Sequence, residues 1–299
     1  MSAISTQDLK VLSRPSDVLG LLHLGGHALL LLGTGAVVWG SRGEPWLPLA
    51  MLLHGVVLVF LFAPLHESIH RTAFASCWLN SATGYACGLI LLLPPNYFRA
   101  FHLAHHRFTQ DPAQDPELIE PKPATLVSWL VHVSGLPNWI SNGKLLLRHA
   151  GGSVTESFIA PKSRRAIVVE ARIYLAIYAA GIALSLAFAS PALVLLWLGP
   201  VLLGQPFLRL YLLAEHTGCS ETPDMLTNTR TTITNPFVRW LAWNMPFHVE
   251  HHAYPGLPFH ALPEAHRRIR RRIVHLGRGY FSVNRAILGE ISRRSTPAP

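Results

Sequence analysis

Charged residues are scarce in this chain of 299 residues: only 14% are Asp, Glu, Lys or Arg, whereas 50% are hydrophobic. Soluble globular domains carry about 25% charged residues. The shortage excludes a disordered chain, and it excludes a surface that water covers throughout. The composition therefore predicts a membrane protein.

Cysteine is also rare. Cys77, Cys87 and Cys219 are the three cysteines, and no two of them form a Cys-x-x-Cys pair. They cannot build a disulfide framework, and a built-in rubredoxin-type or iron–sulfur centre is excluded for want of ligands.

Long apolar runs are abundant by contrast, and about 20 residues suffice to cross the hydrocarbon core. Four runs reach this length: Val18 to Gly40, Trp46 to Leu65, Ala166 to Ala189 and Ala192 to Ala214. Short polar or proline-containing links join them in pairs, which predicts two helical hairpins. A fifth run, Leu79 to Pro95, is about 17 residues long and ends in two prolines. We expect it to be re-entrant or interfacial, within one all-α integral-membrane domain covering residues 1–299.

The positive charge is concentrated at one end of the chain. The net charge is +9, and from Glu264 to residue 299 there are nine Arg against two Glu. A basic tail of this kind favours a cytoplasmic membrane face over nucleic-acid binding, although a solvated charge run without a partner explains it equally well. Two hairpins would return the chain to its starting side, so both termini are expected to be cytoplasmic. The polar residues Asp8, Lys10 and Arg14 before the first run predict a retained span, not a signal peptide.

Histidine is the residue type in clear excess, with seventeen copies, of which nine fall in four short places. Each place lies at or beyond the same-side end of a predicted span. Spacings of three and four residues put side chains on one face of a helix, so each group can aim its imidazoles at a common point. The nine are His66, His70, His102, His105, His106, His216, His248, His251 and His252.

This pattern indicates metal binding. A His-x-x-His-His run is expected by chance roughly 0.05 times in a chain of this composition, and two copies roughly 0.001 times. A zinc site takes three or four protein ligands, and nine imidazoles exceed that number, which implies two metal ions. Imidazole suits iron, copper and zinc alike, so two zinc ions remain an alternative. Open positions at a membrane face favour oxygen activation by two iron ions.

The order of these motifs resembles the integral-membrane fatty-acid desaturase and hydroxylase superfamily over about Leu19 to His266. Two segments are particularly similar to bacterial members of the desaturase branch. They are His105-His106-Arg107-Phe108-Thr109 leading to Asp115-Pro116-Glu117, and Asn244-Met245-Pro246-Phe247-His248-Val249-Glu250-His251-His252 followed by Tyr254-Pro255.

The resemblance implies a nonheme diiron centre held by the nine histidines, with dioxygen as cosubstrate, that attacks an unactivated C–H bond of a long acyl or lipid chain. Asn244 would lie near the metals. A fatty-acid desaturase is the favoured activity. An acyl or alkyl hydroxylase, a decarboxylase that forms a terminal alkene, and a carotenoid ketolase are the alternatives within the superfamily.

Four carboxylates are candidates to orient the ligating histidines, because such ligands need a partner that fixes their tautomer. They are Glu67, Glu215, Glu250 and Asp115. An exposed acidic residue is an equally good interpretation of each. Arg107 and Thr109 are candidates of the same kind.

The substrate path leaves no motif, but Leu89 to Leu93, Tyr97, Phe98, Phe101, Trp240 and Trp243 could line an apolar tunnel or belong to an aromatic interface belt. His23, His27 and His54 lie inside the predicted spans. They are expected either to line that path or to bond to a neighbouring helix.

Electrons must come from another protein, because the chain has no His-Pro-Gly-Gly haem motif, no cysteine cluster and no Gly-x-Gly-x-x-Gly. A ferredoxin, rubredoxin or cytochrome b5 type donor with its reductase is expected. The arginine-rich tail would dock an acidic donor or hold anionic lipid head groups.

Two rival classes stay open. His66-Glu67-Ser68-Ile69-His70 satisfies the His-Glu-x-x-His pattern of zinc metalloproteases, but an intramembrane protease would leave seven clustered histidines without a role. A metal transporter would place its histidines along the spans, whereas these gather at one face.

Overall fold

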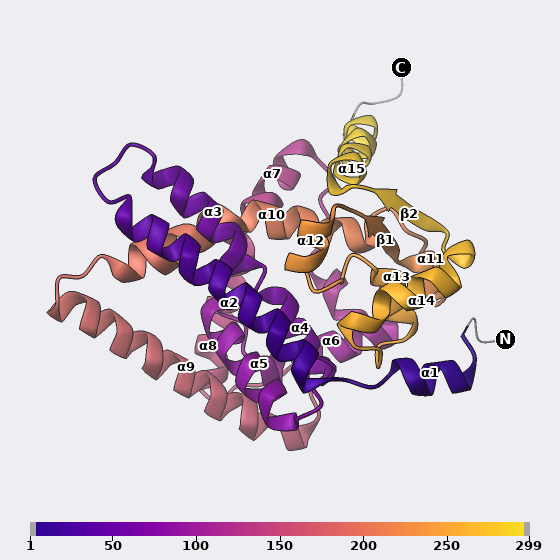
Figure 1. Cartoon of the computed structure of the whole chain (residues 1–299), viewed down its shortest axis with the longest axis horizontal. Coiled ribbons are helices and arrows are strands. Elements are labelled where there is room, and N and C mark those ends of the chain that lie inside the picture. Colours follow the sequence, from indigo (N-terminus) through magenta and orange to yellow (C-terminus); the bar gives the residue numbers. More distant parts are fainter. Residues whose placement is uncertain (1–3, 296–299) are drawn as a thin grey trace.

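The computed structural model describes residues 4–295, which form a mostly helical molecule (Figure 1). Long helices extend toward the left of the view, where the loops that follow α2 and α9 lie. Short elements from the last third of the chain gather on the right, on the same side as both termini. Residues 1–3 and 296–299, including the end of the basic tail, lie outside the described part.

Among residues 4–295, four helices are long and apolar enough to cross a membrane, which confirms the four predicted spans by length and composition. They are α2 (Asp17–Gly40), α3 (Leu47–Val59) continued by α4 (Phe62–His70), α9 (Pro161–Ala187), and the π-helical turn η2 (Val194–Leu198) continued by α10 (Gly199–His216). The second span carries the first histidine pair at its end, and the fourth ends on His216. The main helix contact of α10 is α3.

The fifth apolar run forms a bent helix pair, α5 (Cys77–Leu91) and α6 (Pro95–Phe108), with 95° between the two axes. Leu92 adopts a left-handed φ of 54° and ends α5. Pro94 and Pro95 follow, and a proline lacks the amide hydrogen that would continue the helix. The bend turns α6 and its three histidines back toward α4.

The remaining elements are short and cover the histidine-bearing ends of the long helices. They are α1 (Thr6–Leu12), η1 (Pro116–Ile119), α7 (Leu126–Ser134), α8 (Leu136–Ala150), α11 (Met225–Asn228), β1 (Arg230–Ile233), α12 (Pro236–Leu241), α13 (His248–Ala253), η3 (Phe259–Ala261), α14 (Leu262–Ile269), η4 (Arg270–Arg272), β2 (His275–Arg278) and α15 (Tyr280–Ser295).

A two-stranded parallel sheet departs from the all-α prediction. β1 pairs with β2 in the register Arg230↔His275 through Ile233↔Arg278. The β1 sequence Arg-Thr-Thr-Ile is rich in β-branched residues, which favour strands, but four residues are too few to show a periodic pattern. Because of this pairing, the predicted basic tail is not free: α14, β2 and α15 pack onto the protein.

Two glycines determine how closely α3 and α10 approach. A Cβ added at Gly55 would lie 1.9 Å from the Pro200 carbonyl oxygen, and one added at Gly204 would lie 2.3 Å from the Gly55 carbonyl oxygen. Only hydrogen fits at these positions, so the backbones touch directly. The core around them includes Leu58, Val59 and Val201.

Gly204→Ala is therefore expected to destabilise the protein by about 1–3 kcal/mol, because the new methyl group forces α3 and α10 apart. Thermal unfolding in detergent measures the change. The matched control is Gly33→Ala on α2, where a Cβ meets nothing within 4 Å and alanine improves helix propensity. Equal melting temperatures for Gly204→Ala and the control would contradict the close contact.

Candidate metal centre

Four separate segments deliver the nine histidines to one buried region. His66 and His70 lie one turn apart on α4, and α6 contributes His102, His105 and His106. His216 ends α10, and α13 carries the remaining three, His248, His251 and His252. The structure thus brings together all nine residues that the sequence singled out.

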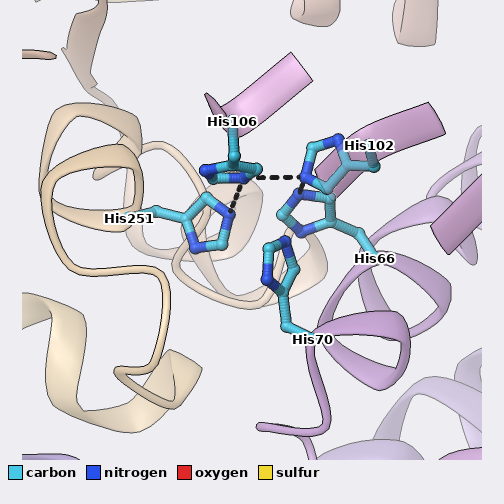
Figure 2. A group of neighbouring side chains, drawn as sticks. All are labelled: His66, His70, His102, His106 and His251. Carbon is cyan, nitrogen blue, oxygen red and sulfur yellow. Dashed lines mark hydrogen bonds between the residues drawn. The ribbon is translucent and has the colours of Figure 1, made fainter. Parts of the chain in front are cut away.

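Five imidazoles form the first cluster, drawn in Figure 2: His66, His70, His102, His106 and His251. Their ligand atoms all lie within 4.8 Å of one another. The Nε2 atom of His102 lies 2.7 Å from that of His66 and 2.9 Å from that of His106. The Nε2 atoms of His251 and His106 are 3.0 Å apart. All but His70 are buried.

The second cluster joins His105, His216 and His252, with His248 beside it. The His105 and His216 Nε2 atoms are 3.3 Å apart, and the His248 and His216 Nε2 atoms are 3.2 Å apart. The two clusters adjoin, since the rings of His106 and His252 stack at 4.1 Å between centroids. Two neighbouring groups of imidazoles are thus available for two ions.

The three rings of the second cluster, those of His105, His216 and His252, are oriented through their other nitrogen. The Nδ1 group of His105 donates to Asp115 over 2.9 Å, that of His216 to the Asn228 carbonyl over 3.3 Å, and that of His252 to the Thr109 hydroxyl over 3.2 Å. With hydrogen on Nδ1, each Nε2 atom presents a lone pair to the cluster centre. The Nδ1 atom of His248 lies 3.3 Å from a Glu215 oxygen.

Asp115 is the most extensively bonded of these partners. Its carboxylate also accepts the backbone N–H groups of Gln110, over 2.8 Å, and Glu117, over 2.9 Å. Burial alone would raise the pKa of Asp115, but the hydrogen bonds from His105 and the two amides outweigh it, so the pKa is lowered. Asp115 is therefore a fixed anion at neutral pH, and it holds the ring of His105 in place.

The donor sets fit metal ions. A metal bound by imidazole nitrogens at about 2.0–2.1 Å, with angles between tetrahedral and octahedral, separates neighbouring nitrogens by roughly 2.9–3.4 Å. The Nε2 separations given above run from 2.7 to 3.3 Å. Where both nitrogens of such a pair present a lone pair, the two repel, and a shared cation removes the repulsion.

Burial keeps the three imidazoles of α13 neutral. It holds the pKa values of His248, His251 and His252 well below their ordinary range, with neighbouring histidines adding to the effect. Neutral rings retain the lone pair that a metal requires. Among the described residues, the Nδ1 atoms of His66, His106 and His251 in the first cluster, and of His248 beside the second, have no hydrogen-bond partner. These rings lack the protein anchors that hold His105, His216 and His252.

Three residues that were expected to support the metal site, Glu67, Asn244 and Glu250, form hydrogen bonds with residues other than the nine histidines. Glu67 accepts a hydrogen bond of 2.8 Å from the Thr72 hydroxyl and one of 3.1 Å from the Phe259 backbone amide. Successive helical residues point about 100° apart, so adjacency to His66 does not aim Glu67 at the metal site. The Asn244 amide, at a left-handed φ of 59°, donates to the Phe259 carbonyl.

Glu250 is the third, and it accepts hydrogen bonds from His266 and Thr231. His266 lies outside the repeated motifs, so the sequence argument left it aside. Thr231 belongs to β1, which explains why the small sheet matters to the site: it fixes the carboxylate that lies between His248 and His251 in the chain.

The sequence did not predict two further contacts with the histidines, those of Asn228 and Glu117. Asn228 acts through its backbone carbonyl, which carries no sequence signal. Glu117, with an oxygen 3.0 Å from the His105 Nδ1 atom, stands two residues after Asp115, and that spacing was the available clue. Arg107 is exposed.

The histidines inside the spans bond to neighbouring elements, which is one of the two roles expected for them. The Nε2 atom of His23 lies 2.7 Å from the Trp240 carbonyl oxygen, that of His27 lies 3.0 Å from Val57, and that of His54 lies 3.1 Å from Leu196. These contacts link α2 to α12 and to α3, and α3 to η2.

A cavity of about 440 Å³ opens beside the two clusters. Histidines of both clusters, among them His66 and His216, contribute to its wall. Of the predicted tunnel residues, Leu91, Leu93, Tyr97, Phe98 and Phe101 line it, whereas Trp240 and Trp243 pack around His23 instead. The cavity thus places these apolar side chains beside the candidate metal centre.

Long apolar helices and buried histidine clusters together define an integral membrane protein with a site suited to metal. Comparison with known sequences identifies the family: the fatty acid desaturase model matches residues 44–284, more than half of the chain. The chain belongs to the fatty acid desaturase family, and it is accordingly an oxidoreductase of lipid metabolism.

Three curated relatives are similar to this chain. The sn-1 oleoyl-lipid 12-desaturase of Picosynechococcus sp. is 24% identical over 86% of this chain and 80% of its own length. The dihydrorhizobitoxine desaturase of Bradyrhizobium elkanii is 28% identical over 85% and 76%. The sn-1 oleoyl-lipid 12-desaturase of Anabaena variabilis is 27% identical over 34% and 29%.

Removing one first-cluster ligand tests the metal assignment. His106→Ala is expected to lower the metal content of purified protein by about one ion per chain, because the remaining rings no longer enclose the site. Inductively coupled plasma mass spectrometry measures it. His275→Ala on β2 is the matched control, expected to keep full metal content. Wild-type content in His106→Ala would refute the assignment.

Asp115→Asn tests the orientation of His105. The amide is neutral and binds the ring more weakly, so the affinity for one of two metal ions should fall by about 10–100-fold. Competition with a chelator of known affinity gives the value. Asp111→Asn, in the same loop but bonded to Ala113 and Gln114, should leave both affinities unchanged; an equal effect of the two substitutions would argue against the role of Asp115.

Proposed function

We propose that this protein is a membrane-bound, oxygen-dependent diiron desaturase that introduces a double bond into an acyl chain. One observation carries the proposal: nine imidazoles, all but that of His70 buried, form two adjacent clusters beside a cavity whose wall includes histidines of both clusters. The five histidines around His66 would hold one iron, and the four around His216 would hold the other.

Two iron ions at this place would supply the oxidising chemistry, using dioxygen and two electrons to remove hydrogen from an unactivated C–H bond. The reaction balances when one saturated C–C bond, one dioxygen, two electrons and two protons give one alkene and two waters. The protein contributes positioning. Asp115 and Thr109 orient rings of the second cluster, and the apolar cavity wall excludes water from the reacting chain.

Desaturation is favoured over the other superfamily reactions because the relatives are named as desaturases that act on different molecules, an oleoyl lipid and dihydrorhizobitoxine. Desaturation is the reaction that both names describe. Hydroxylation, decarboxylation and ketolation are distinguished from it by the product. The protease alternative is disfavoured, since five histidines surround the site and Glu67 bonds to Thr72 and Phe259.

We place the protein in a bacterial inner membrane, with the histidine clusters and both termini on the cytoplasmic side. The two hairpins and a re-entrant α5–α6 pair account for this arrangement, and the bend of 95° supports the re-entrant part. Electrons would come from a separate ferredoxin, rubredoxin or cytochrome b5 type protein with its reductase. Exposed Arg270 and Arg271 offer an acidic donor a basic surface, whereas Arg267 and Arg268 pair with Glu264.

The proposal predicts a new double bond in the lipids of a host that expresses the protein, found by gas chromatography and mass spectrometry of acyl chains. Reconstituted turnover should consume about one dioxygen per double bond and stop without a donor protein. His251→Ala should abolish product while the protein remains in the membrane. An alcohol or a terminal alkene as the sole product would replace desaturation by the corresponding alternative, and turnover without a donor would contradict the separate electron source.

A further inference from the structure

One charged side chain in the fourth span has no role in the metal centre. Arg209 lies on α10, within the span Val194–His216. One guanidinium nitrogen, Nη1, donates to the Asn138 side-chain oxygen over 3.1 Å, and its Nε atom is buried without a hydrogen-bond partner. No ion pair found among residues 4–295 includes Arg209.

Arg209 lines the same cavity as the histidine clusters. It stands seven residues before His216, which places the two Cα atoms on one face of α10 and about 10.5 Å apart along its axis. The cavity therefore offers a guanidinium group about two helical turns from the candidate metal centre.

Arg209 has charged neighbours but no ion-pair partner among the described residues. His132 on α7 also lines the cavity, and burial followed by the charge of Arg209 lowers the pKa of this histidine to about 4, so the ring is neutral. The charges of Glu117 and Glu120, both exposed, act on Arg209 without contacting it. Of the four carboxylates on the cavity wall, Glu117 contacts His105, Glu156 pairs with Arg148, Glu215 lies 3.3 Å from the Nδ1 atom of His248, and Glu120 is exposed.

Close packing fixes this polar end of the cavity. Gly135, at a φ of +70°, joins α7 to α8, and a Cβ there would lie 2.6 Å from the Gln205 side chain on α10. Gln205 lies one turn before Arg209, and its Oε1 atom is buried without a partner. Asn138 follows Gly135 by three residues, so the contact positions it against Arg209.

A partly buried guanidinium without an anion in direct contact is costly, and an ionisable residue inside a span commonly marks a substrate path. Its planar fork matches the oxygens of a carboxylate or a phosphate. A neutral head group would leave the charge unpaired. The missing component is therefore a ligand that carries an anionic oxygen group.

We propose that Arg209, positioned by Asn138, binds an anionic group of the substrate, so that the substrate is an acyl compound with a carboxylate or phosphate head. The inference rests on the proposed function to the extent that the cavity is the acyl site. It restricts the substrate to acyl compounds with an anionic head group, because a neutral glycerolipid or ester would bind without an ionic contact to Arg209.

Equilibrium binding to the detergent-purified full-length protein tests this, because it needs neither donor nor turnover. The probes are oleate against methyl oleate, and dioleoyl phosphatidate against dioleoylglycerol. The wild type should bind at least one acidic probe about tenfold or more tightly than its neutral partner, since charge-assisted hydrogen bonds contribute about that much. A preference in the first pair assigns a carboxylate, and in the second a phosphate.

Arg209→Gln should abolish the preference while leaving affinity for the neutral probe unchanged, which also shows that the variant is folded. Asn138→Ala, on another helix, should reduce the preference and provides a second test. The matched control is Arg172→Gln on α9, whose Nε group donates to the Ala150 carbonyl at the surface; it should behave as wild type.

Equal binding of acidic and neutral probes by the wild type, or an undiminished preference in Arg209→Gln, would overturn the inference. Iron content and oxygen-dependent turnover of the same preparations keep the two proposals apart. A preference that depends on Arg209 in protein without iron or turnover would support the anion site and contradict the desaturase proposal.

Discussion

The arrangement of the histidine-bearing segments depends on one electrostatic constraint: imidazoles from four segments meet with their Nε2 atoms close together, and Nε2 atoms that all present lone pairs repel one another. His102 lies 2.7 Å from His66 and 2.9 Å from His106 through the Nε2 atoms. Such a group is repulsive by itself and becomes favourable around a cation. Metal binding and the packing of α4, α6, α10 and α13 are consequently linked, and loss of the metal should loosen the region where these elements meet.

Three features of the fold bring the histidine-bearing segments together. Direct backbone contact at Gly55 and Gly204 fixes α3 against α10. His66, on α4 directly after α3, and His216, at the end of α10, line the same cavity. The bend between α5 and α6 turns a third set of histidines toward them. The sheet between β1 and β2 then fixes Glu250 through Thr231. The same α10 helix carries Arg209, so one rigid element relates the metal centre to the proposed anion site.

Features that depend on composition, or on residues a few positions apart, could be predicted from the sequence. Apolar length located the four spans to within a few residues, and intervals of three and four residues selected the nine histidines that converge. The sequence could not predict contacts made by the tertiary fold. Glu67 and Glu250 neighbour ligand histidines in the chain but point to Thr72 and His266, and Asn228 takes part through a carbonyl that every residue possesses. The strand at Arg230 was too short for a periodic signal.

Metal analysis of wild-type protein tests the central claim most directly. The protein should be purified in detergent after expression with sufficient iron, and iron and zinc should be measured per chain. Two clusters that each hold one ion predict about two irons per chain and little zinc. About one zinc per chain with little iron would contradict a diiron centre.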